Sequence, residues 1–372
     1  MRIFAIVAAA LVILGAVIAL GSAHLLWTPE DVYLVPRVHF GFADTYVLAE
    51  RWRADPSAHP ALTAALERSG LTEPLHAAGV NTAAPNLHTL RGVEVSLFWF
   101  ILYGFIAASA FYIAYVIWRR RWMGAGGTAV VGLNFAAATL LLVVRTLEAR
   151  HVPYANLYEF MVSFMWALTL FYLIFERVAA ARGMNIKPAG AVVMPVGVAL
   201  LVFMARLPHA YRSVESLMPA LKSNWLIFHV ITGVIGYGAA AVAFGMAIWY
   251  LLRRGRQPGP QEMSQETLDD LMYQCVRISF PFLTLLLITG AVWGRVAWSR
   301  YWGWDPKETA SLVTWLVYLV YMHARLLRGW RGAPAALLLV IGFGSVIFTF
   351  LGVSVLEKYK ESLHGYAAGM GS

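Results

Sequence analysis

The sequence predicts an all-α protein, a polytopic membrane helix bundle of about nine transmembrane helices with one soluble segment on the outer face. Three observations carry this prediction. Apolar residues make up 60% of the 372 positions, and only 13% are charged. The mean hydropathy is +0.64. Apolar runs of about 17–25 residues, the length that spans a bilayer, recur along nearly the whole chain.

The apolar runs give the expected helices and divide the chain into two parts. The helices fall roughly at residues 3–22, 94–118, 128–146, 157–175, 188–206, 225–252, 271–297, 308–327 and 334–354. The first run has features of a signal peptide, although we favour a retained anchor. Residues 1–93 therefore form an N-terminal anchor plus an outer-face, periplasmic segment, and residues 94–372 form a multi-helix membrane core.

The basic residues predict how the helices are oriented. Short loops at 119–127, 176–187, 253–270 and 325–333 each carry three Lys or Arg. Such loops remain cytoplasmic, so the N-terminus is expected inside. The net charge of +9 therefore reflects topology, and we exclude a nucleic-acid partner. The long segment 27–93 lies outside, and its four histidines show no metal-ligand spacing.

The cysteine content excludes several kinds of redox and heme chemistry. Cys275 is the single cysteine, and it lies inside an apolar run. One thiol forms no internal disulfide, no CxxC pair and no CxxCH heme-attachment site. Cys275 is therefore expected to be a packing residue.

The densest chemical signal is the segment 293–315, WGRVAWSRYWGWDPKETASLVTW, which holds five of the fourteen tryptophans. Its candidate ligand-binding residues are Trp293, Trp298, Trp302, Gly303, Trp304 and Asp305. An aromatic belt at the membrane interface explains such residues as well as a platform for a flat ligand does. Pro306 after Asp305, with Glu308 in the first turn, predicts a helix start.

Two histidines are expected on the same membrane face as this segment. Two helix crossings separate His229 from the Trp-rich segment, and two more separate that segment from His364. Two imidazoles beside aromatic walls are suitable axial ligands for heme iron. Arg295, Arg300 and Lys307 are candidate partners for the heme propionates. A histidine that only bonds a backbone carbonyl at the interface remains the alternative for each.

Two further places carry candidate residues. His323 lies some fifteen residues into the helix that follows the Trp-rich segment, or about 22 Å deeper at 1.5 Å per residue. An ionisable group inside a membrane helix is a functional candidate, while a histidine at a helix end is the alternative. His151 and Glu159 flank a turn containing Pro153 and Asn156, which predicts either a cavity wall or a helix cap.

Several of these segments resemble a known family. WGWDPKE at 302–308 and YMHAR at 321–325 resemble the "WWD" signature of heme-handling proteins in cytochrome c biogenesis. HVPYANLYEF at 151–160, NWLIFHV at 224–230 and ESLHGY at 361–366 follow in the family's order. The resemblance covers most of residues 94–372 and is strongest to the CcsA/ResC (also called CcsB) membrane subunit of system II.

The resemblance implies a function and a set of partners. It implies non-covalent heme b, with His229 and His364 as axial ligands of an external heme and His323 at an inner site. It implies heme transport, presentation and covalent attachment to apocytochrome c, as the heme-handling subunit of a heme lyase (synthase) complex. The implied partners are a CcsB/ResB-like membrane subunit, a CxxCH-containing apocytochrome c and a thiol reductant. The implied location is the bacterial inner membrane, with the heme site facing the periplasm.

Two other functions remain open at this stage. A system I protein uses the same signature to deliver heme to a chaperone without forming thioether bonds. A redox b-type cytochrome needs paired histidines on facing helices across the bilayer, whereas His229 and His364 share one face. Neither the catalytic residues nor the role of segment 27–93 follows from the sequence.

Overall fold

The computed structural model describes residues 86–149, 151–207, 221–255 and 263–355, with side chains described between residues 93 and 354. Every regular element within these ranges is a helix. The elements are α5 (Asn86–Trp118), α6 (Arg121–Ala149), α7 (Leu157–Ala181), α8 (Lys187–Ala205), α9 (Asn224–Leu252), α10 (Gln265–Trp298), α11 (Pro306–Leu327), α12 (Ala333–Ile347), the π-helix η5 (Phe348–Gly352) and α13 (Val353–Val355). The predicted helix at 3–22 and His364 lie outside the described residues.

Eight helices in the described ranges are long and apolar enough to cross a membrane. They correspond one to one with the other eight predicted helices, so the all-helical membrane bundle is confirmed. Three of them begin well before the residue that hydropathy indicates, and α5 starts at Asn86 instead of 94. α6 starts at Arg121 instead of 128, and α10 starts at Gln265 instead of 271. The first turn of α10 is polar, and Ser264 caps it by accepting from Thr267 N at 3.1 Å.

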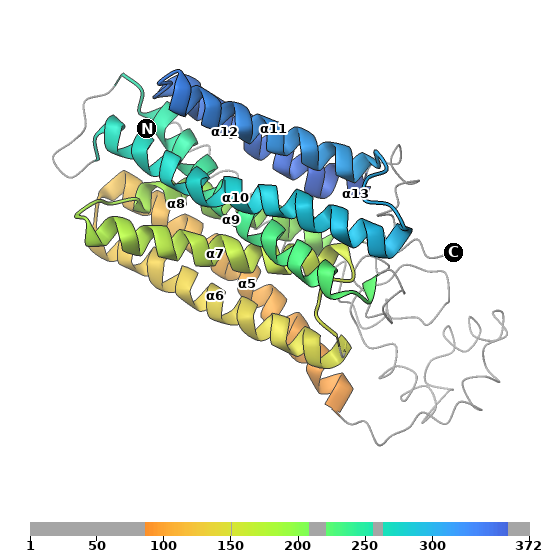
Figure 1. Ribbon diagram of the computed structural model, residues 1–372. Coiled ribbons are helices and arrows are strands. Elements are labelled where there is room, and N and C mark those ends of the chain that lie inside the picture. The colour runs from red at the N-terminus through yellow and green to blue at the C-terminus, as the bar shows by residue number, and fades with distance from the viewer. Residues whose placement is uncertain (1–85, 150, 208–220, 256–262, 356–372) are drawn as a thin grey trace, which may run out of the picture.

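The central helix of the bundle is α9. It packs against α7, α8, α10 and α12, while α5 and α6 pair on one side and α11 and α12 pair on the other (Figure 1). Small residues on α9 make this close packing possible. A Cβ at Gly245 would lie 2.1 Å from Cγ2 of Val193 on α8, so only glycine fits there. At Gly238, α9 comes similarly close to α7, because a Cβ there would lie 2.9 Å from Phe171.

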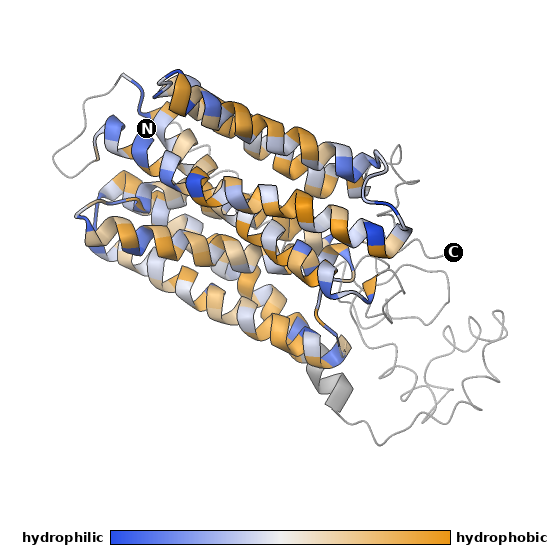
Figure 2. Ribbon diagram, viewed as in Figure 1, coloured by the Kyte–Doolittle hydropathy of each residue, from blue (hydrophilic) through white to orange (hydrophobic). Residues whose placement is uncertain are grey.

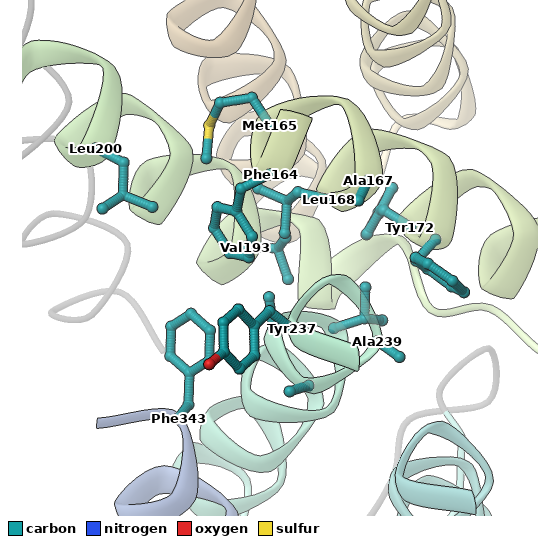
Figure 3. Close-up of a cluster of buried hydrophobic side chains, with 14 of the residues drawn as sticks. Phe164, Met165, Ala167, Leu168, Tyr172, Val193, Leu200, Tyr237, Ala239 and Phe343 are labelled. Atoms are coloured by element: carbon teal, nitrogen blue, oxygen red, sulfur yellow. The ribbon is translucent and has the colours of Figure 1, made fainter. Parts of the chain in front are cut away.

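The core lies where α7, α8, α9 and α12 meet. Figure 3 shows Phe164 and Leu168 of α7, Val193 of α8, Tyr237 of α9 and Phe343 of α12 gathered around this junction. The outward faces of the helices are also apolar, and hydrophilic residues concentrate toward the helix ends and connections (Figure 2). A bundle that is apolar both inside and outside suits surrounding lipid.

Charged side chains hold one end of the bundle together. Arg325 of α11 donates to both Asp269 and Asp270 of α10, the latter at 3.0 Å. Asp269 also accepts from the backbone N–H of Gly332, just before α12, at 2.8 Å. Cys275, on the same helix as these aspartates, is fully buried. Its predicted role as a packing residue agrees with this position.

Candidate functional site

A cavity opens at the end of the bundle opposite to the Asp269–Arg325 cluster. It has an empty volume of about 1000 Å³, counting the space at its mouth. Its walls come from the start of α7, the start of α9, the end of α10, the connection to α11, the start of α11 and η5. Most of the lining is aromatic or apolar. The aromatic members are Tyr154, Phe160, Tyr237, Trp293, Trp298, Tyr301, Trp302 and Phe350.

His229 lies in this wall, in the second turn of α9. Ser223 begins the helix by accepting a hydrogen bond from Trp225 N at 3.2 Å, which sets the position of the following turns. The imidazole Nδ1 bonds to the carbonyl of Leu286 on α10 at 3.0 Å. A carbonyl only accepts, so Nδ1 carries the proton. This bond fixes both the tautomer and the plane of the ring.

Packing also holds the His229 ring in place. The ring stacks on the indole of Trp293, with centroids 5.7 Å apart and an angle of 21° between the planes. Gly290 of α10 also lies against the ring, so closely that a Cβ there would lie 2.9 Å from His229 Cε1 and Nδ1. His229 and the Trp-rich segment therefore lie at the same end of the bundle, as helix parity predicted. The interfacial alternative also has support, since the histidine does bond a backbone carbonyl.

The five tryptophans of segment 293–315 take different places. Trp293 is buried and meets Trp298 edge-on at a centroid distance of 4.8 Å, and Trp302 joins them in the cavity wall. Trp304 is 69% exposed and contacts Trp302 edge-on. Trp315 lies outside the site, where its Nε1 donates to Thr284 of α10 at 2.9 Å. The five tryptophans therefore include residues of the cavity wall, an exposed residue and a packing residue.

The connection before α11 is shaped by its own hydrogen bonds. Asp305 is buried and caps α11 by accepting from Lys307 N at 3.1 Å. Glu308 completes the capping box, because its carboxylate accepts from Asp305 N at 3.2 Å and from Gly303 N at 2.8 Å. The predicted helix start at Pro306 is confirmed. Trp304 has a φ of +57°, a strained value for a residue with a side chain.

The three candidate propionate partners lie in different surroundings. Lys307 lines the cavity, and its Nζ donates to Ser354 of α13 at 3.1 Å. Arg295 and Arg300 are exposed, and neither lines the cavity. The guanidinium of Arg300 packs against Gly303, where a Cβ would lie 2.6 Å from Arg300 Cζ. The space beside Gly303 is therefore filled by an arginine of the chain itself.

The turn before α7 forms another part of the cavity wall. Tyr154, Ala155 and Asn156 line the cavity, whereas His151 and Glu159 do not. Asn156 caps α7 by accepting from Glu159 N at 3.0 Å. Two roles were predicted for His151 and Glu159, lining a cavity or taking part in a helix cap. The geometry supports the helix cap. Burial raises the pKa of the Tyr154 hydroxyl above its ordinary value.

A buried ionic cluster beneath this turn was not predicted. Arg145 of α6 donates to Glu159 at 2.8 Å and to Glu94 of α5 at 3.3 Å, and all three side chains are at most 3% exposed. The second oxygen of Glu159 accepts from Ala155 N at 2.7 Å. Charged residues within apolar helices are the sequence signal that identifies such a cluster in advance.

His323 occupies a different surface from His229. It lies in the last two turns of α11 and is exposed on the outward side of the helix, away from the cavity. Within the described ranges, no group of three metal-ligating side chains accompanies it. Its predicted role in an inner site stays a prediction, and the same holds for His364, which lies outside the described residues.

Comparison with known proteins agrees with this arrangement. The family model for "Cytochrome C assembly protein" matches residues 154–360, a range that includes the Trp-rich segment and His229. A CcsA cytochrome c biogenesis protein of Synechococcus elongatus is 35% identical over 66% of this chain and 87% of its own length. The CcsA protein of Synechocystis is 32% identical over 69% of this chain and 92% of its own.

Among solved structures, the cytochrome c heme lyase CcmF has the same fold. Its TM-score is 0.54 at 18% identity, with 75% of this chain and 50% of CcmF covered. The chain thus spans half the length of that protein, and the similarity concerns the fold alone. The family match and the CcsA relatives go further, and they establish that this multi-pass membrane protein belongs to the cytochrome c assembly protein family, as a CcsA-type subunit with a role in cytochrome c maturation.

Proposed function

We propose that the cavity binds heme b non-covalently and presents it for covalent attachment to apocytochrome c. The observation that carries this proposal is the oriented imidazole of His229 beside tryptophans of the signature segment. A histidine that donates its other ring N–H to a backbone carbonyl is the usual arrangement for a metal ligand. Such a bond fixes the tautomer and raises the basicity of the ligating nitrogen.

The lining of the cavity fits a porphyrin. Its walls are mainly aromatic and apolar, which suits the faces of a flat macrocycle. Of the lysines and arginines in the described ranges, only Lys307 lines the cavity, so it is the proposed partner of a propionate. Arg295 and Arg300, which are exposed, are weaker candidates for that role.

His364 is proposed as the second axial ligand. Ser354 accepts from Lys307 at the cavity, and His364 follows ten residues later in the chain. A tail that leaves from this point needs no further membrane crossing to return to the cavity. Heme iron with two histidine ligands has both axial positions filled, which limits access of oxygen.

His323 is proposed to contribute to a second, deeper heme site on the way to the cavity. Its outward position on α11 means that the facing ligand would come from another membrane helix. That helix is proposed to belong to a CcsB/ResB-like partner subunit. Heme would then move from the cytoplasmic side of the bacterial inner membrane to a cavity facing the periplasm, in line with the basic loops at the opposite end.

In the attachment reaction, each cysteine S–H of a reduced CxxCH motif adds across a heme vinyl group and forms a thioether bond. This chain's contribution is to orient the heme with His229, His364 and Lys307 while the apocytochrome c docks at the exposed side of the Trp-rich connection. The reaction needs reduced thiols, which are proposed to come from a separate thiol reductant.

Co-expression tests this function. The chain is produced with a ResB-like subunit and an apocytochrome c in cells lacking their own maturation system, and covalent heme is detected by heme staining after denaturing electrophoresis. We expect stained cytochrome c that is lost when the apocytochrome cysteines are changed to serine. Heme-loaded chain without stained cytochrome would instead identify a system I type of heme delivery.

A further inference from the structure

One face of α11 carries polar side chains along its entire length. Its members follow one another every three or four residues, which places them on one side of a helix. They are Lys307, Ser311, Thr314, Tyr318, Tyr321 and Arg325. At 1.5 Å per residue, the row extends over roughly 27 Å, close to the thickness of the hydrocarbon core. We call these six residues the α11 polar row.

The middle of the α11 polar row is buried inside the bundle. Thr314, Tyr318 and Tyr321 are each only 1% exposed. The hydroxyls of Tyr318 and Tyr321 have no hydrogen-bond partner within the described part of the chain. Two adjacent buried phenols without partners are unusual, because burying an unpaired hydroxyl is unfavourable. Ordered internal water is the ordinary partner of such groups.

Both ends of the α11 polar row reach polar surroundings. At the cavity end, Lys307 and Ser311 line the cavity, and Thr314 shares a hydrogen bond of 2.9 Å with Thr349, another lining residue. Tyr318 and Tyr321 follow Thr314 on the same face of α11, each about one turn further from the cavity. Polar side chains on this face therefore lead from the cavity to the buried phenols.

At the opposite end, Arg325 is the last member of the α11 polar row and forms ion pairs with two aspartates of α10. Asp269 is buried, whereas the side chain of Asp270 is 53% exposed and accepts from Arg325 at 3.0 Å. Tyr321 lies one turn before Arg325 on the same face of α11, so the row leads from the buried phenols to this partly exposed cluster.

We propose that a file of water molecules occupies the inner face of α11 and gives protons a path between the Asp269–Asp270 cluster and the cavity. The waters bond to the hydroxyls of Tyr321, Tyr318 and Thr314 in turn. Protons enter at the partly exposed Asp270 end of the row and pass along this file toward Ser311. The path is a property of the helix bundle and does not depend on which ligand the cavity binds.

X-ray hydroxyl-radical labelling tests for the waters. Radicals formed from bound water oxidise the side chains beside it, and mixing with isotope-labelled water shows how fast that water exchanges. We expect Tyr318 and Tyr321 of the full chain to be oxidised although they are buried. Tyr112 is the matched control, since it is fully buried and its hydroxyl bonds to Glu176 at 3.0 Å. Phenols at 318 and 321 as unreactive as Tyr112 would overturn the proposal.

Proton flux tests the path itself. The full chain is reconstituted in vesicles, a potassium diffusion potential is applied, and an internal pH dye reports proton uptake. We expect the double variant Tyr318→Phe/Tyr321→Phe to take up protons severalfold more slowly than the wild-type chain. The variant retains both rings, so the packing is preserved. Tyr103→Phe, on the exposed surface of α5, is the control and should leave the flux unchanged. Equal flux in wild type and double variant contradicts the path.

Discussion

Arg145 Nε donates to Glu159 Oε1 at 2.8 Å, and this buried pair joins α6 to the first turn of α7. The other oxygen of Glu159 accepts from the backbone N–H of Ala155, a residue of the cavity wall. Glu94 of α5 binds the same guanidinium. Three helices are thus connected to one wall of the cavity through a single arginine, so the shape of that wall depends on a residue that does not touch the cavity.

Replacing Arg145 with leucine should destabilise the protein strongly. The change leaves Glu94 and Glu159 buried without their cation, a loss that costs roughly 3–5 kcal/mol for buried pairs. Thermal unfolding of the purified chain in detergent measures it. Arg331→Leu is the control, because the Arg331–Asp270 pair is largely exposed and such pairs contribute about 1 kcal/mol or less. Equal unfolding temperatures for the two variants would rule out a structural role for the cluster.

His229→Gly should remove most of the heme that copurifies with the chain. The variant loses the ligand held by Leu286 and leaves a space that free imidazole fills. The absorption spectrum of the purified protein, with and without added imidazole, is the measurement. Recovery of heme with imidazole distinguishes a lost ligand from a misfolded chain. His151→Ala, outside the cavity lining, serves as the control, and unchanged heme in His229→Gly would exclude the ligand assignment.

Gly290→Ala should weaken heme binding although it changes no candidate ligand. The added methyl group would lie 2.9 Å from the His229 ring and would displace it from the Leu286 carbonyl. Gly344→Ala is a matched control in α12, since nothing lies within 4 Å of the added atom. That control should keep its heme and gain up to about 1 kcal/mol of helix stability. Similar heme content in both alanine variants would contradict a positioned His229.

Lys307→Met should lower the affinity for heme by roughly tenfold or more, the effect of losing a hydrogen bond to a charged group worth about 1.5–3 kcal/mol. Methionine has nearly the same length and preserves the apolar packing. Titration of heme into the purified chain measures the affinity. Arg300→Met should bind as the wild type does, because Arg300 packs on Gly303 outside the cavity lining. A larger loss in Arg300→Met than in Lys307→Met would reassign the propionate partner.

The membrane helices could be predicted from the sequence because each depends on local composition. Eight predicted helices agree with the described ones, apart from the first turns of α5, α6 and α10. A hydropathy average misses those turns because it measures side-chain polarity, whereas the helical hydrogen bonds are made by the backbone. The start of α11 was also predictable, because Asp305, Pro306 and Glu308 form a cap from neighbouring residues.

The association of His229 with the Trp-rich segment was predictable for a topological reason. An even number of crossings brings two segments to the same face of a membrane, whatever the packing of the helices. The choice among candidates on that face was not predictable. Lys307 lines the cavity, whereas Arg295 and Arg300 are exposed, and helix parity assigns all three to the same place.

The sequence by itself determined the number of helices in the described core, the cap of α11 and the shared face of His229 and the Trp-rich segment, since each follows from local patterns or from counting crossings. Only the tertiary structure decided that His229 bonds the carbonyl of Leu286, that Arg145 joins Glu94 to Glu159 and that His323 faces outward. These relationships join residues far apart in the chain, and they depend on the rotation of each helix about its axis. That rotation is set by side-chain packing between neighbouring helices, which no single segment encodes.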